Sequence, residues 1–171
     1  MPDELAIRRA SPDDAARLLG HLQALVAEPG INIPLAPDEV TATLEQERER
    51  LAGFEDAPRA IILVAERDAE LLGELTLRGI SSRRAVKHVA TLGVSVRADA
   101  RRRGIGDALL AAALEWAPTA GISRVELYVY ARNEPAIELF DKHGFVTEGR
   151  RRNFIREGDG FIDDLVMAKL V

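Results

Sequence analysis

Three arginines and two glycines, in the run Arg101-Arg102-Arg103-Gly104-Ile105-Gly106, carry the chemistry that is most easily read from this chain. Glycine has no Cβ, so the backbone can approach an anion and point several N–H groups at it. Arginine adds charge-assisted hydrogen bonds to phosphate oxygens. An apolar strand expected at Val89 to Val96 precedes the run, and a helix with an apolar stripe follows it. Because a helix N-terminus supplies unpaired N–H donors and a positive dipole end, the run predicts a polyphosphate site.

Two better-known phosphate motifs do not fit this run. A P-loop needs Lys-Ser or Lys-Thr after its second glycine, whereas Asp107 and Ala108 follow Gly106. The dinucleotide fingerprint needs a small residue three positions after its second glycine, and Leu109 stands there. The pattern that remains is Arg-x-x-Gly-x-Gly between a strand and a helix.

A second run, residues 133–145, follows an alternating strand expected at Val125 to Tyr130. Asn133 is a good helix N-cap, Pro135 suits the first helical turn, and Gly144 suits the position just after the last turn. Taken alone, this run predicts a short capped helix.

In this order, the two runs resemble the acyl-coenzyme A motifs of the GCN5-related N-acetyltransferase (GNAT) superfamily. The first is similar to its pyrophosphate loop, and the second to its motif Asn-x-x-Ala-(Ile)-x-Leu-Tyr-x-x-x-Gly-Phe. The resemblance covers nearly the whole chain, with most of its specificity in residues 88–145. The tail, from Glu148-Gly149 to Met167-Ala168, is similar to that of the bacterial branch that acetylates amino acids, polyamines or related small amines.

The resemblance implies a complete set of cofactor contacts. Backbone groups of the strand Leu92 to Val96 would bind the pantetheine arm, and an N–H near Val94 would polarise the thioester carbonyl. The loop Arg101 to Asp107 would hold the pyrophosphate, and Asn133 would bind the arm near the acyl end. The residues implied to bind acetyl-CoA are Leu92, Val94, Val96, Arg101, Arg102, Arg103, Gly104, Ile105, Gly106, Asp107, Asn133 and Phe140.

Acyl transfer to an amine requires proton transfers, because an ammonium group with a pKa of about 10.4 attacks only after it has lost a proton. Phe140 stands where many superfamily members place the tyrosine that protonates the leaving thiolate, and a phenyl ring cannot donate a proton. Tyr130 and Tyr128 are substitute acids, although each is also expected as a packed strand aromatic. Glu74, which interrupts an apolar strand, and His88, just before the central strand, are the candidate bases. Each has an alternative interpretation as a surface residue, Glu74 as a solvent-facing strand residue and His88 as part of a turn.

The predicted function is transfer of the acetyl group of acetyl-CoA to a primary amine of a small molecule, such as an amino acid, through a ternary complex. Two alternatives stay open at this point. One is acetylation of a protein N-terminus or lysine, and the other is a non-catalytic acyl-CoA sensor, which Phe140 makes worth testing. The resemblance is also compatible with a homodimer.

Composition excludes several other classes of function. The 171 residues suit one domain, expected to span residues 1–171, and the net charge of −5 offers no footprint for nucleic acid. No cysteine is present, and His21, His88 and His143 have no metal-ligand spacing, so no metal is expected. No signal peptide is evident, and the longest apolar run, Ala108 to Leu114, is too short to span a bilayer. We therefore expect a cytoplasmic protein without a membrane partner.

Hydrophobic periodicity predicts the element order β-α-α-β-β-β-α-β-α-β-β. This describes a mixed α/β domain with a twisted sheet of about six to seven strands and about four helices. The first helix should bury Leu18, Leu22 and Leu25, and the second should include Val40. The resemblance implies that loops at residues 28–37 and 150–160 border the acceptor pocket. The arginines of the second loop (Arg150, Arg151, Arg152 and Arg156) would suit an acceptor with a carboxylate.

Overall fold

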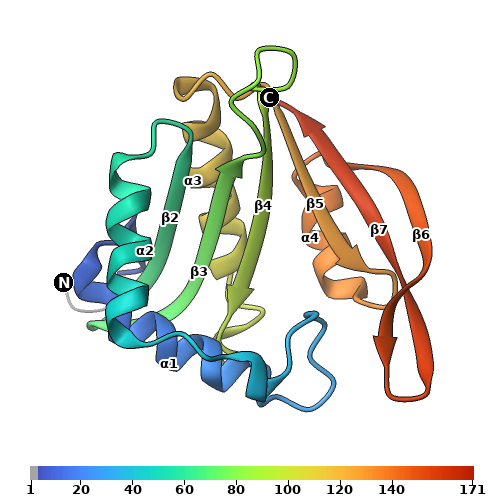
Figure 1. Ribbon diagram of the computed structural model, residues 1–171, viewed down its shortest axis with the longest axis horizontal. Coiled ribbons are helices and arrows are strands. Elements are labelled where there is room, and N and C mark those ends of the chain that lie inside the picture. The colour runs from blue at the N-terminus through green and yellow to red at the C-terminus, as the bar shows by residue number, and fades with distance from the viewer. Residues whose placement is uncertain (1–3) are drawn as a thin grey trace.

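A computed structural model describes residues 4–171 as seven strands in one sheet, with four α-helices (Figure 1). The sheet order is β1-β2-β3-β4-β5-β7-β6, and every neighbouring pair is antiparallel except β4 and β5. The predicted mixed α/β fold is confirmed. The strands are β1 (Ala6–Arg9), β2 (Ala60–Arg67), β3 (Glu70–Gly79), β4 (Val89–Val96), β5 (Arg124–Tyr130), β6 (Val146–Glu157) and β7 (Gly160–Leu170). The helices are α1 (Ala15–Val26), α2 (Leu44–Asp56), α3 (Ile105–Thr119) and α4 (Glu134–Lys142).

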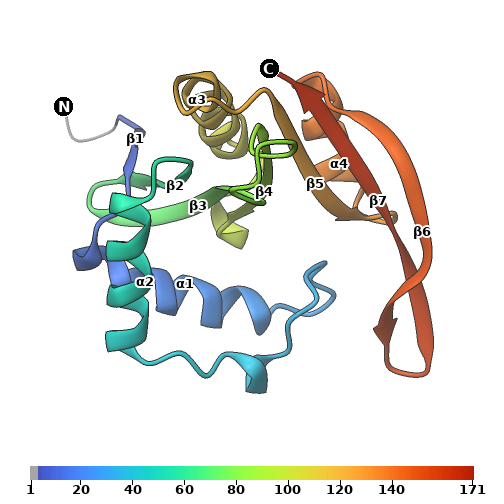
Figure 2. The same cartoon turned by 45° about the horizontal axis from the view of Figure 1, so that its top comes forward.

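The helices cover the two faces of the sheet in pairs. Figure 2 shows α3 and α4 on one side of the sheet and α1 and α2 on the other. Alternate residues of the central strands, such as Leu75, Leu92 and Leu127, join the main core with α3 and α4. On each of these strands, the intervening residues therefore point to the opposite side of the sheet. We call this side the α1–α2 face. No helix formed by residues 4–171 is long and apolar enough to cross a membrane.

The sheet opens between its two parallel strands. β4 and β5 pair only through Val89, Ala90 and Thr91, and beyond these residues the strands diverge (Figure 1). Within residues 4–171, no strand pairs with this edge of β4 from Leu92 to Val96. We call this stretch the free edge of β4. Backbone N–H and C=O groups there must find other hydrogen-bond partners.

Two helix starts and one turn show how local sequence fixes these elements. The first helical segment begins after Ser11, whose N–H donates to the Asp14 carboxylate in a capping box. The second helix was predicted to include Val40 but begins only at Leu44, because Thr43 provides the N-cap. The hairpin turn between β2 and β3 is made by Asp68 and Ala69, which have φ of 51° and 63°, as a tight hairpin requires.

The last two strands form a long hairpin that extends away from the helices (Figure 2). Residues 150–160 were predicted to form a loop, and this was wrong: β6 continues to Glu157 and turns sharply into β7. The irregularity in this segment is a bulge, where Asn153 has φ of 54° and its N–H donates to the Asp163 carboxylate. Arg151 pairs with Asp164 of β7, thirteen positions further along the chain. This pairing outweighs the preference of the polar local sequence for a loop.

Candidate active site

The loop between β4 and α3 presents a row of unused backbone donors. Among residues 4–171, no backbone oxygen accepts a hydrogen bond from the N–H groups of residues 102–107, and the first helical bond runs from Ala108 to Gly104. Arg102 and Gly104 have φ of 63° and 78°, which turns successive N–H groups toward one side. We call residues 101–107 the arginine–glycine loop. Six such donors at a helix N-terminus are suited to bind an anion.

The three arginines of this loop have different surroundings. Nε of Arg101 donates to the Val96 carbonyl at 2.9 Å, and its guanidinium pairs with Glu28 at 2.7 Å. Arg101 therefore ties the loop to the end of β4 and to the segment after α1. Arg102 and Arg103 are exposed, and the only ion pair of Arg102 within residues 4–171 is a 4.0 Å contact with Glu138. These two side chains are available to a ligand.

The carboxylate of Asp107 is engaged by two residues at the end of α4. Its carboxylate accepts a hydrogen bond from Lys142 Nζ at 2.5 Å and lies 3.1 Å from His143 Nε2. Lys142 and then His143 hold the pKa of Asp107 below its usual value. The carboxylate thus joins the start of α3 to the end of α4, and only the backbone N–H of Asp107 belongs to the anion site.

The second predicted motif folds as the sequence indicates, with its side chains close to the loop. Oδ1 of Asn133 accepts from the Ala136 N–H at 3.4 Å and caps α4, while Gly144 ends the helix with φ of 81°. Phe140 is 5% exposed and packs edge-to-face on Phe145, with ring centroids 5.8 Å apart. Between the two helices, a Cβ on Gly106 would lie 3.1 Å from Leu139 Cδ2, so a larger residue would require the Leu139 side chain to shift.

Glu74 lies on the α1–α2 face beside the free edge of β4. It is the register partner of Ser95, and in such a pair the Cβ atoms lie about 4.5–5.5 Å apart. Burial raises the pKa of Glu74, Arg50 opposes this, and Glu47 adds to it. Arg50 is held by Glu47 through two hydrogen bonds, of 2.8 and 2.6 Å. A carboxyl group with a raised pKa is suited to accept a proton near neutral pH.

His88 does not lie near Glu74. It is exposed, and it precedes β4 at the end where β4 and β5 pair. Its carbonyl accepts hydrogen bonds from the N–H groups of Ser123 and Arg124. Ser95 is seven positions further along the strand, which corresponds to about 23 Å at 3.3 Å per residue. The structure therefore does not bring the two predicted bases together.

Tyr130 ends β5 on the other side of the opening. If the register of β4 and β5 is continued from Val89 and Arg124, Tyr130 comes opposite Ser95. The Tyr130 side chain is buried on the α1–α2 face. Burial raises the pKa of its hydroxyl group, and the negative charge of Glu157 raises it further. Tyr128, two residues earlier, is exposed, with the Arg151 guanidinium 4.2 Å from its ring centroid.

A pair that the sequence did not reveal completes this side of the opening. Nε2 of His21 lies 2.8 Å from Oγ of Ser95. The predicted stripe of α1 placed Leu22 inside, but His21 is the more buried of the two. Neither a lone histidine nor a lone serine has a sequence signal, and the two residues are 74 positions apart. Only the packing of α1 on the sheet brings them together.

Two of the four arginines predicted to attract a carboxylate are paired with aspartates. Arg150 pairs with Asp163, and Arg151 with the buried Asp164. They extend from strand β6 instead of from a loop. Within residues 4–171, no group of three or more His, Asp or Glu side chains is arranged to hold a metal ion.

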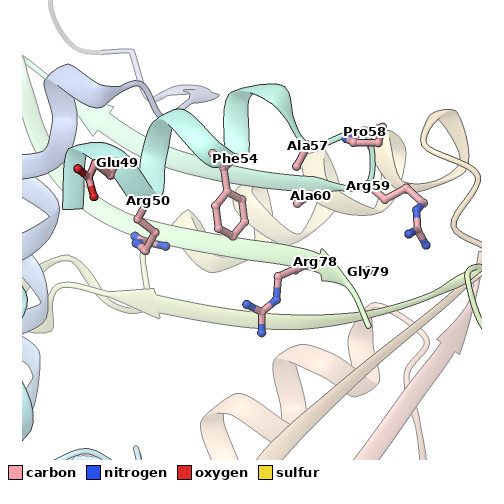
Figure 3. Close-up of a pocket in the computed structure, with 10 residues that line it drawn as sticks. Glu49, Arg50, Phe54, Ala57, Pro58, Arg59, Ala60, Arg78 and Gly79 are labelled. Atoms are coloured by element: carbon pink, nitrogen blue, oxygen red, sulfur yellow. The ribbon is translucent and has the colours of Figure 1, made fainter. Parts of the chain in front are cut away.

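A cavity of about 390 Å³ lies between α2 and the ends of β2 and β3 (Figure 3). Phe54 and Arg50 approach it from α2, and Arg78 approaches it from β3. Arg78 is the register partner of Thr91, so the cavity lies toward the paired end of β4 and not at its free edge. The cavity therefore lies away from Ser95, and Arg50 is shared between its lining and the surroundings of Glu74.

Comparisons with known proteins agree with this geometry. Residues 31–145 match the model of the acetyltransferase (GNAT) family. The L-amino acid N-acetyltransferase AaaT of Escherichia coli K12 is 31% identical over 170 residues, covering 98% of each chain. A crystal structure of a GNAT-family acetyltransferase from Streptococcus pneumoniae superposes with a TM-score of 0.93 at 32% identity, covering 98% of this chain and 100% of that one. A structure of yncA from Salmonella typhimurium with its cofactor acetyl-CoA shares the fold, with a TM-score of 0.83 at 19% identity over 97% of this chain and 93% of that one.

Proposed function

Because the chain belongs to the acetyltransferase (GNAT) family and is an N-acetyltransferase, we propose that it moves the acetyl group of acetyl-CoA to the primary amine of an amino acid or a related small amine. The observation that carries the proposal is the position of the six unused N–H donors of the arginine–glycine loop, directly beyond the free edge of β4. The arginine–glycine loop offers donors for a pyrophosphate, and the free edge of β4 offers donors and acceptors for an amide-bearing arm.

The residues present fit acetyl-CoA. The N–H groups of residues 102–107 would hold the pyrophosphate, assisted by the exposed Arg102 and Arg103. The free edge of β4, with Leu92, Val94 and Val96, would bind the pantetheine arm, and Asn133 would contact it from α4. When bound, acetyl-CoA supplies an activated acetyl group on a thioester.

On the α1–α2 face, we assign Glu74 as the base that removes the first proton from the acceptor's ammonium group. Its partly buried position raises its pKa, which brings the carboxylate closer to the basicity that proton removal needs. The structure gives His88 no comparable place, so we leave it out of this assignment. Tyr130, across the opening, is one candidate acid for the leaving thiolate.

An acceptor with a carboxylate fits the charges near Glu74. The positive charge of Arg50 acts on Glu74 and lowers its pKa, and the Arg50 side chain is partly exposed although Glu47 holds it in place. A relative that acts on L-amino acids is consistent with this acceptor class. We also propose that residues 1–171 act as one domain and that the reaction takes place in the cytoplasm.

The test is mass spectrometry of the purified protein with acetyl-CoA and a panel of L-amino acids, polyamines and simple alkylamines. We expect acetylated amino acids, and we expect Arg50→Met to raise KM for amino acids but not for alkylamines. If the protein binds acetyl-CoA and acetylates none of these amines, the sensor alternative gains support. If polyamines are the preferred acceptors, the assignment of Arg50 is wrong.

A further inference from the structure

His21 and Ser95 form a pair that the proposed function does not yet use. The contact of 2.8 Å between His21 Nε2 and Ser95 Oγ joins α1 to the free edge of β4. His21 is 8% exposed and lies within the buried stripe of α1, between Leu18 and Leu25. A polar side chain in such a stripe is costly unless it is hydrogen-bonded, and Ser95 is the partner here.

Ser95 occupies a particular place on the α1–α2 face. It follows Val94 on the free edge of β4, and its register partner on the next strand is Glu74. Ser95 is therefore one strand nearer to the opening than Glu74 is. A serine hydroxyl can donate one hydrogen bond and accept others at the same time, so it can pass a proton between two neighbours.

The chemistry of the proposed reaction needs two proton acceptors. An ammonium group loses one proton before it attacks and a second from the nitrogen of the tetrahedral adduct, while the departing thiolate takes up one. Glu74 accounts for the first proton only. Phe140, which lies in the core against Phe145, has no proton to give to the thiolate.

The ring of His21 has the protonation state that a proton acceptor needs. Burial lowers the pKa of His21, which favours the neutral ring at neutral pH. Of the charged groups that face it, Glu28 opposes this shift, whereas Arg101 and Arg97 reinforce it. A neutral ring with its hydrogen on Nδ1 leaves Nε2 free to accept from Ser95.

We propose that Ser95 and His21 carry the second amine proton from the acceptor nitrogen to the departing thiolate. As the N–H bond breaks, Ser95 Oγ takes that proton and gives its own to Nε2 of His21. The C–S bond breaks, and its electron pair stays on sulfur. His21 then returns the proton to Ser95 Oγ while Ser95 gives its proton to the sulfur. The pair ends as it began, so it needs no outside proton in each cycle.

This inference rests on the proposed acetyl transfer, and it competes with Tyr130 as the thiolate's acid. Tyr130 would have to regain its proton from elsewhere after each cycle, and its raised pKa makes it a weaker donor. In the shuttle, Ser95 is the group that contacts the reacting atoms. His21 is a positioning residue and proton store that acts through Ser95.

The test measures kcat for the full chain and its variants Ser95→Ala, His21→Ala, His21→Gln, the double variant Ser95→Ala/His21→Gln, and Tyr130→Phe. Thermal shifts with CoA show which variants still fold and bind. His21→Ala is also assayed with imidazole and with pyrazole, a ring of the same size that is a far weaker base. Pyrazole therefore separates filling of the space from proton transfer.

We expect Ser95→Ala and His21→Gln each to lower kcat by about 100-fold, the scale of general acid–base catalysis. The double variant should lose no more than about threefold beyond either single variant, because the two residues act as a unit. Imidazole should raise the kcat of His21→Ala by at least about tenfold, and pyrazole should not. Tyr130→Phe separates the two candidate acids, because the shuttle predicts a smaller loss of kcat for it than for Ser95→Ala.

Equal effects of imidazole and pyrazole, multiplying losses in the double variant, or abolition of activity by Tyr130→Phe would each overturn the shuttle while leaving the acetyl transfer intact. A wild-type protein that acetylates no amine would overturn the proposed function and the shuttle with it.

Discussion

The arginine–glycine loop presents a ligand with backbone N–H groups from one continuous segment, whereas the α1–α2 face presents side chains from α1, β3 and β4. The loop's donors come from residues 102–107 and depend on two positive φ angles. The face depends on His21, Glu74 and Ser95, which only tertiary packing brings together. The contrast indicates a division of labour in which the loop binds the cosubstrate and the face handles protons.

The largest effect should come from Glu74→Gln, which removes the proposed base and leaves the loop unchanged. We expect kcat/KM at pH 7 to fall by about 100-fold or more, with the loss shrinking as the pH approaches the acceptor's own pKa near 10. The measurement is a pH–rate profile with an amino acid acceptor. Glu45→Gln, an exposed carboxylate on α2, is the matched control and should change little. A ratio that stays flat with pH would remove Glu74 from proton transfer.

Phe140→Tyr tests the division of labour because it adds an acidic hydroxyl group on α4, on the other side of the sheet from Ser95 and His21. In the Ser95→Ala background, the new hydroxyl should raise kcat by about tenfold, because it replaces the lost proton route. In the wild-type background the gain should be small. Phe145→Tyr, its buried ring neighbour, serves as the control. If Phe140→Tyr has no effect in either background, the thiolate does not need a proton from the protein.

Glu74→Gln should affect stability in the opposite direction from activity. Folding raises the pKa of Glu74, so the group favours the folded state while it is protonated, and this advantage is lost as the pH rises through the raised pKa. At pH 8 the buried carboxylate is a cost that glutamine does not carry. We therefore expect a higher Tm for the variant than for the wild type at pH 8, with the difference disappearing near pH 4. Equal Tm differences at both pH values would contradict the raised pKa.

The smallest effect should come from Glu28→Gln, which links the two regions. Glu28 pairs with Arg101 of the loop and also faces His21. Releasing Arg101 should tighten acetyl-CoA binding by about threefold, within the range of a partly exposed ion pair. The change should be measured at two salt concentrations, because screening at high salt weakens the competition between Glu28 and the cosubstrate's phosphates for Arg101. Weaker binding would mean that the pair with Glu28 holds Arg101 in its binding position.

How far the sequence predicts each region follows from the same contrast. The loop and the helix after Asn133 were predicted because glycine, arginine and capping residues act within a few positions of one another. Glu74 was proposed from a polar interruption of an apolar strand. His21 and Ser95 gave no signal, because the rotation of α1 that turns His21 inward is fixed by packing.

The errors in secondary structure have a related origin. Residues 150–160 contain glycine, aspartate and four arginines, and they were predicted to form a loop from local composition. They form a strand because β7 supplies hydrogen-bond partners that are distant in sequence. Val40 fits a helical stripe, but the cap at Thr43 decides where α2 begins. In each case a longer-range or more specific interaction overrides a weak local preference.

The division of labour is tested most directly by calorimetric titration of acetyl-CoA into Gly106→Val and Glu74→Gln. A side chain at position 106 would meet Leu139 at 3.1 Å beside the loop's donors, so we expect affinity to fall by about 100-fold in a variant that remains folded. Gly53→Ala, in an open position on α2, is the control for glycine replacement. Glu74→Gln should bind acetyl-CoA as the wild type does. Normal binding by Gly106→Val together with lost binding by Glu74→Gln would show that the α1–α2 face, and not the loop, holds the cosubstrate.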